Sequence, residues 1–136
     1  KRDSLEAFGT DAVIARVLDT LAPCRDRCIV ISFEQDALVH ARAAGAARIG
    51  WVVTGWDEAQ RAIANALAPD YLFCNYTKLP AADTPLWPGP WRWVFYEVTD
   101  PALALVLAQR GADLIETMAL DAYAIPPWSL RMADDA

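Results

Sequence analysis

The sequence predicts an α/β domain in which about five parallel strands are covered by helices. Apolar runs of strand length alternate with helical patterns five times along the chain. The stretch from 91 to 117 shows the pattern most fully, as strand, helix and strand with little loop between them. The expected strands lie near 28–33, 49–53, 71–74, 93–98 and 113–116.

The stretch 91–117 contains the clearest local signals. Residues 93–98 are rich in aromatic and β-branched side chains, which favours a strand. Asp100 is an expected N-cap, Pro101 falls at the first helical position, and Gly111 follows the helix as a C′ glycine. Two strands joined by so short a helix, with no hairpin turn, are expected to be parallel in a right-handed unit.

Alternation along the last two strands predicts a polar cluster. Tyr96 and Val98 share one face of the first strand, and the apolar residues are expected to pack under the helix. Glu97, Thr99 and Glu116 would then point away from it, near the carboxyl ends where ligands of α/β proteins bind. Two acids there suit a cation or a hydroxyl-rich ligand. The alternative is a pair of solvated or mutually paired carboxylates.

The first half of the chain supplies two strand-and-helix steps. Residues 1–9 are polar and are expected to be frayed or to act as a tether. Thr10 would cap a helix over 11–21, and the strand 28–33 is apolar enough to be covered on both faces. A helix over 35–44 carries His40, the only histidine, which favours a surface role over a catalytic one.

The middle of the chain continues the rhythm and then breaks it. A helix over 56–67 follows a capping-box-like start at Thr54 and Asp57. Trp51 is expected in the core, with pocket lining as the alternative. Residues 79–90 contain too much proline for a full helix. The nearby tryptophans Trp87, Trp91 and Trp93 are expected to fill the resulting gap or to form an aromatic platform.

Composition excludes several classes of partner. The net charge of −6 argues against binding to a phosphate backbone, and no apolar run approaches the length of a membrane span. Three cysteines, Cys24, Cys28 and Cys74, make neither a disulfide framework nor a four-ligand zinc site. We expect reduced thiols and a cytoplasmic location, although Cys24 and Cys28 are close enough in sequence to pair.

Three segments, in order, resemble the glycerophosphodiester phosphodiesterase family. CIVISFEQDALVHAR is similar to the family's Ser-Phe strand end and following helix, PDYLFCNY to its Asp-Tyr-Leu-Asn-Pro strand, and VFYEVTDPALALVLAQRGADLIET to its closing segment. The resemblance covers roughly residues 10–123 and implies the C-terminal half of a (β/α)8 barrel, because a complete barrel takes about 250 residues. Glu97 stands in place of the family's Thr, Thr99 in place of its Asn, and Glu116-Thr117 in place of Thr-Asp.

The resemblance also implies a substrate cleft and a missing catalytic half. The cleft candidates are Ser32, which we expect to face the barrel axis, and Asn75, Lys78, Glu97, Thr99 and Glu116. The alternative for Lys78 is an ordinary exposed loop lysine. The family's catalytic parts are a His-Arg-Gly strand end, a Glu-x-Asp pair, a second histidine and a Glu-x-Lys strand. We expect none of these in this chain, and we assign it no catalytic residue and no metal ligand.

Two functions from different classes follow. In the first, an intact parent hydrolyses glycerophosphodiesters to glycerol 3-phosphate and an alcohol with a divalent metal, Mg or Ca, and this chain alone is inactive. In the second, the chain is a non-catalytic half-barrel that forms homo-oligomers or pairs with a missing N-terminal half through its open sheet edges. An unrelated doubly wound domain is a third possibility. The start at KRDSL suggests a trimmed piece, with a frayed segment (1–9), a partial barrel (10–123) and an irregular tail (124–136).

Overall fold

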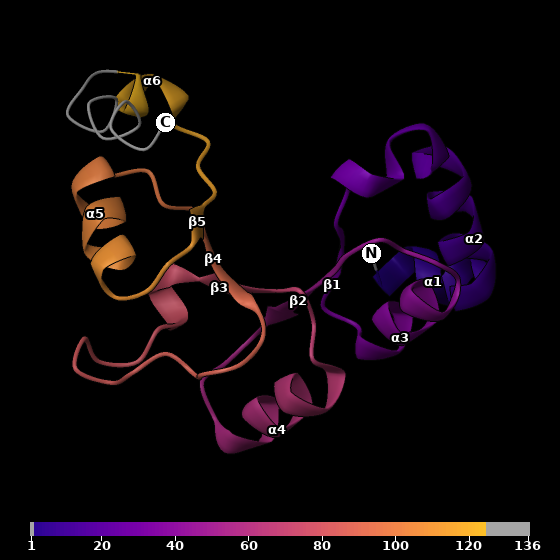
Figure 1. The fold of residues 1–136 in the computed structure, drawn as a ribbon, viewed down its shortest axis with the longest axis horizontal. Coiled ribbons are helices and arrows are strands. Elements are labelled where there is room, and N and C mark those ends of the chain that lie inside the picture. Colours follow the sequence, from indigo (N-terminus) through magenta and orange to yellow (C-terminus); the bar gives the residue numbers. More distant parts are fainter. Residues whose placement is uncertain (1, 125–136) are drawn as a thin grey trace.

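A computed structural model describes residues 2–124 and contains one five-stranded sheet. Its strands are β1 (Val30–Ser32), β2 (Ile49–Val53), β3 (Tyr71–Asn75), β4 (Arg92–Tyr96) and β5 (Leu114–Ile115). They lie side by side in sequence order, and each is parallel to the next (Figure 1). The predicted parallel α/β fold is therefore confirmed. A doubly wound sheet reverses its strand order part-way along the chain, so this topology excludes that alternative.

The helices are α1 (Arg2–Phe8), α2 (Thr10–Leu21), α3 (Gln35–Ala43), α4 (Glu58–Leu67), α5 (Pro101–Gln109) and α6 (Leu120–Tyr123), with 3-10 helices η1 (Ala22–Arg27) and η2 (Tyr76–Lys78). Helices α1 to α5 pack on one face of the sheet. Buried side chains of α2, α3, α4 and α5 form one core with Trp51, Leu72 and Trp93 of the sheet. These three residues are register partners across β2, β3 and β4, so they share a face.

The other face of the sheet carries a smaller apolar row. Val52, Phe73 and Val94 are register partners and form a separate cluster, which the helices do not join. At the two edges of this face, the row is open: Phe33 beyond β1 is 56% exposed and Leu114 of β5 is 45% exposed. The sheet is thus covered on the helix side, while its flanks on the other side reach solvent.

Most predicted elements form, with boundaries set by their caps. The Asp57 side chain accepts a hydrogen bond from Gln60 N at 2.9 Å, so α4 begins at Glu58, two residues after the predicted start. Asp100 caps α5 through Ala102 N at 2.8 Å, and Pro101 occupies the first turn as expected. Thr10 lies inside α2, whose N-cap is Gly9 at φ 78°.

The segment 79–90 contains no helix or strand, as predicted. The guanidinium of Arg110 holds it by donating to the carbonyl oxygens of Pro80, Ala81 and Thr84, at 3.0, 2.8 and 3.0 Å. Trp87 stacks on Trp56 with ring centroids 4.3 Å apart. Because Trp51, Trp87, Trp91 and Trp93 are all buried, these tryptophans serve as core and not as an exposed platform.

The N-terminal segment differs from the expectation of a frayed tether. Residues 2–8 form helix α1, in which Leu5 packs against the main core. Arg2 also bonds Glu34, so the segment has both an apolar and an ionic anchor. The predicted irregular tail lies outside the described residues from 125 onward. Within the described part, no helix has the length and apolarity that crossing a bilayer requires.

Candidate functional site

The carboxyl ends of β3 and β4 bring together two of the predicted cleft residues. Asn75 Nδ2 donates to Glu97 Oε2 at 2.6 Å. Asn75 Oδ1 in turn accepts from Thr77 N at 3.0 Å and from Thr77 Oγ1 at 2.7 Å. The Asn75 amide is therefore fixed on both sides, and it presents the Glu97 carboxylate at the end of the sheet.

Glu97 reaches this position because the chain is bulged there. Glu116 N donates to Phe95 O at 2.9 Å, and Val98 N donates to Glu116 O at 3.2 Å. A regular parallel ladder would use the residue two after Phe95, so one residue is extra. Glu97 adopts φ 63°, a left-handed conformation that is costly for a non-glycine residue. The bulge returns Val98 to the core under the helices, and Glu97 stays exposed.

The predicted polar orientation is therefore right for Glu97, but its explanation was wrong. Trp93 and Phe95 occupy the helix-covered face, so alternation places Tyr96 on the opposite face beside Val94. The alternation in the sequence predicted Tyr96 to lie with Val98 under the helix. Counting back from the two aromatic core residues, Trp93 and Phe95, would have assigned Tyr96 to the open face.

Tyr96 is the residue that the sequence analysis missed, and it lies among the acidic candidates. Burial raises the pKa of its phenol most strongly, and electrostatic interactions with Cys74, Glu97 and Glu116 raise it further. A hydrogen bond with the backbone of Asn75 partly offsets this. The phenol therefore remains a neutral hydroxyl at physiological pH, able to donate or accept a hydrogen bond beside two carboxylates.

The remaining candidates, Glu116, Thr99 and Lys78, are exposed residues that follow strands β3 to β5 in the sequence. Glu116 is exposed and follows β5 directly, and Thr99 is exposed between the bulge and α5. Lys78 is exposed at the end of η2, three residues beyond Asn75. The structure gives no side-chain contact that joins Thr99 or Lys78 to the Asn75–Glu97 pair within the described residues.

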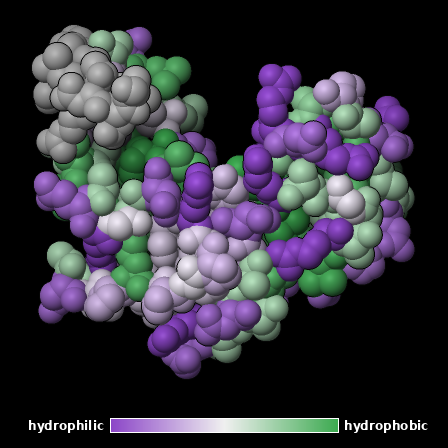
Figure 2. Space-filling model, in the orientation of Figure 1, coloured by the Kyte–Doolittle hydropathy of each residue, from purple (hydrophilic) through white to green (hydrophobic). Residues whose placement is uncertain are grey.

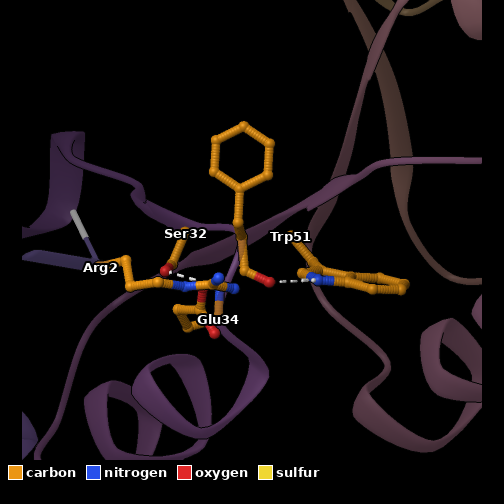
Figure 3. A network of polar contacts seen from close by, with 5 residues as sticks. Arg2, Ser32, Glu34 and Trp51 are labelled. Atoms are coloured by element: carbon orange, nitrogen blue, oxygen red, sulfur yellow. Dashed lines mark hydrogen bonds and ion pairs between the residues drawn. The ribbon is translucent and has the colours of Figure 1, made fainter. Parts of the chain in front are cut away.

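Ser32 lies on the face opposite to the one predicted. Its register partner is Trp51, a buried residue of the helix-side core, whereas Ile31 pairs with Gly50 on the open face. Ile31 and Phe33, not Ser32, therefore point toward the barrel interior. Ser32 Oγ instead accepts from Glu34 N at 3.0 Å and stabilises the turn into α3 (Figure 3).

A cavity of about 700 Å³ lies at the carboxyl ends of β1 and β2. Its apolar wall consists of Ile31, Phe33 and Val52. The rim carries the Arg2–Glu34 ion pair, in which Arg2 Nε donates to Glu34 Oε1 at 2.8 Å (Figure 3). Figure 2 shows the molecule hollowed between the body formed by α1–α3 and the rest of the chain. The size and lining suit a small amphipathic ligand.

The expectation that the family's acidic pair is absent needs correction, because Glu34 and Asp36 form one Glu-x-Asp sequence. Glu34 is the N-cap residue of α3 and is paired with Arg2, while Asp36 is exposed in the first turn of that helix. Residues 2–124 contain no group of three or more His, Cys, Asp or Glu side chains placed to hold a metal ion. The donor set of these residues does not fit the divalent metal that the resemblance implies.

His40, the only histidine, lies away from this end of the sheet, and Cys74 lies in the core of the sheet. His40 is exposed on α3, and its Nδ1 lies 2.6 Å from Asp11 Oδ1 on α2. Cys74 is buried on β3, and burial raises the pKa of its thiol to about 11. All three cysteines are free thiols.

Comparison with known proteins identifies the fold. No protein-family model matches the chain, and no curated protein matches it significantly. Among solved structures, the chain is similar to an Oleispira antarctica phosphodiesterase in complex with the product sn-glycerol-3-phosphate, with 19% identity and a TM-score of 0.65. The chain has a partial glycerophosphodiester phosphodiesterase-like fold. The match covers 93% of this chain and 51% of the phosphodiesterase, so the chain spans about half the length of that protein.

Proposed function

We propose that this chain is the C-terminal, substrate-cleft half of a glycerophosphodiester phosphodiesterase-like protein. The observation that carries the proposal is the likeness to half of a phosphodiesterase. It is supported by polar groups gathered at the carboxyl end of the parallel sheet, where barrel enzymes bind substrate. The intact parent would hydrolyse glycerophosphodiesters to glycerol 3-phosphate and an alcohol.

The residues of this chain would position the substrate and would not transfer protons. Asn75, Tyr96 and Glu97 offer hydrogen-bonding groups to the hydroxyls of a glycerol unit, with Thr99 and Glu116 beside them. Lys78 would attract the phosphate. The divalent metal, Mg or Ca, and the catalytic histidines would come from the other half of the parent, so this chain alone would be inactive. The parent would act in the cytoplasm.

The test is an assay of the intact parent protein on glycerophosphocholine with and without a metal chelator. We expect release of sn-glycerol 3-phosphate that the chelator abolishes, and no release by residues 1–136 alone. In the intact parent, Glu97→Gln should raise KM more than it lowers kcat, because it removes a positioning contact. His40→Gln, on the outer helix α3, is the matched control and should leave both constants unchanged. A parent inert on every glycerophosphodiester would overturn the proposal.

A second candidate function is a non-catalytic half-barrel that assembles through its open face. The supporting observation is the exposure of Ile31, Phe33 and Leu114 on the flanks of that face, next to the edge strands β1 and β5. Exposed edges and apolar flanks favour association with a second copy or with the missing half.

Light scattering of the purified chain measures its oligomeric state and so tests the assembly function. Association through the open face predicts a dimer or larger species that Phe33→Asp converts to monomer. Val106→Asp is the matched control, since Val106 on α5 is also 56% exposed but lies on a helix. A wild-type chain that stays monomeric at high concentration would count against the assembly function.

A further inference from the structure

Two cysteines outside the candidate site lie side by side, Cys24 within η1 and Cys28 at its C-cap. Cys24 Sγ and Cys28 Sγ are 3.5 Å apart, and both residues are half-buried free thiols. η1 connects α2 to β1, and its backbone departs from helical geometry at Cys24, with φ −136° and ψ 21°. The kink allows two residues four apart to direct their sulfur atoms at each other.

We propose that Cys24 and Cys28 form a reversible dithiol–disulfide site that reacts with a small anionic disulfide of the glutathione class. The sulfur atoms need to approach by about 1.5 Å to reach the bond length of a disulfide. The site is independent of the proposed hydrolase function, because neither cysteine contributes to the candidate cleft.

The surroundings assign different roles to the two thiols. Cys24 lines an open cavity of about 450 Å³, together with Arg25, Asp26 and Arg27, whereas Cys28 does not. The hydrogen bond with Cys24 and burial raise the pKa of the Cys28 thiol. The raised pKa favours the protonated form of Cys28, and the geometry allows either sulfur to donate the hydrogen bond. Cys24 is the attacking thiol, and Cys28 is the resolving thiol.

The reaction is a two-step exchange. The Cys24 thiolate attacks one sulfur of the oxidised small molecule, forms a mixed disulfide, and releases one thiol, which takes up the Cys24 proton. Cys28 then attacks Cys24 Sγ, forms the internal disulfide, and releases the second thiol with the Cys28 proton. The two cysteines are oxidised, and one small disulfide is reduced to two thiols. The resulting disulfide links Cys24 of η1 to Cys28, two residues before β1 begins.

The charges around Cys24 select the oxidant. Arg25 and Arg27 contribute two cationic groups to the cavity and Asp26 one anionic group. A disulfide bearing carboxylates should therefore react faster than a neutral one of similar size. Cys74 is an internal control, because it is buried and its thiol pKa of about 11 leaves it protonated at neutral pH.

The test exposes the reduced chain to oxidised glutathione at neutral pH, followed by acid quenching, alkylation and mass spectrometry of the peptide that contains residues 24–28. We expect that peptide to lose two hydrogen atoms while Cys74 remains open to alkylation after denaturation. Cys28→Ser should trap glutathione on Cys24, and Cys24→Ser should react several-fold more slowly. Persistent mixed disulfides in the wild-type chain, or a bond to Cys74 or between chains, would overturn the proposal.

A charge-neutralised variant tests the selection of the oxidant. Arg25→Gln combined with Arg27→Gln should slow the reaction with oxidised glutathione several-fold and leave the reaction with neutral hydroxyethyl disulfide nearly unchanged. An equal slowing with both oxidants would show that the arginines act on the fold or on the thiols, and would overturn the assignment of an anionic disulfide.

Discussion

The two ends of the sheet use acidic side chains in opposite ways. At the amino end, Asp113 donates its N–H to Trp93 O at 2.9 Å, and its Oδ2 accepts from Trp93 N at 2.7 Å. Asp70 makes the same pair of bonds with Ile49, at 3.0 and 2.9 Å. At the carboxyl end, Glu97 is instead exposed on a strained backbone and bonds a side chain.

This contrast separates scaffold from site within one sheet. The amino-end aspartates satisfy backbone donors that strand pairing would leave open, so they join each strand to its predecessor. At the carboxyl end, the Glu97 carboxylate bonds the side-chain amide of Asn75 instead of a backbone donor, so it can exchange this partner for a ligand. Substitutions at the amino end should therefore reduce stability, and substitutions at the carboxyl end should alter local conformation and binding.

The largest effect is expected from Asp113→Ala. The change leaves the N–H of Trp93 without its acceptor beside the tryptophan core, which costs about 1–3 kcal/mol in the free energy of unfolding. Urea denaturation followed by tryptophan fluorescence measures the loss. Asp83→Ala, at an exposed loop position, is the control and should change stability by less than about 0.5 kcal/mol. A loss at Asp113 no larger than the loss at Asp83 would show that the amino-end aspartate does not stabilise the scaffold.

A smaller difference in stability is expected between two variants at the bulge, with glycine more stable than alanine. Glycine tolerates the φ of 63° at position 97, so Glu97→Gly should be about 1 kcal/mol more stable than Glu97→Ala. Both variants lose the bond to Asn75, and their difference therefore isolates the backbone cost. If the alanine variant equals the glycine variant in urea denaturation, the left-handed conformation carries no strain, and this side of the comparison fails.

The smallest effect is electrostatic. Removing one negative charge with Glu97→Gln should lower the pKa of the Tyr96 phenol, because that charge disfavours the phenolate. Glu116→Gln should act in the same direction. Ultraviolet titration, with Tyr96→Phe used to identify the signal of Tyr96, measures the shift. An unchanged titration in both variants would show that the carboxylates do not face Tyr96.

Periodicity and capping predict most of the architecture of this chain. The Asp100-Pro101 start and the Gly111 end locate α5 almost to the residue, and five βα steps without hairpin turns require parallel strands. These signals are local, so the sequence alone reveals them. The sequential strand order, which excludes a doubly wound sheet, is implied by the family resemblance and is seen in the structure.

The errors have a common physical origin in tertiary contacts. The bulge at Glu97 depends on hydrogen bonds from β5, which no local pattern encodes. Ser32 faces the helices because the short strand β1 takes its register from Trp51. Helix α1 forms because Leu5 and Arg2 find partners distant in sequence. Each outcome required knowledge of what lies across the sheet or across the core.

The order of the strands has a consequence for the motions of this chain. Because two strands lie on each side of β3, its amides can exchange only after the outer strands have separated or the whole domain has unfolded. Deuterium should therefore enter β1 and β5 first, β2 and β4 next, and β3 last. The molecule should fray from both margins inward, and its centre should report global unfolding.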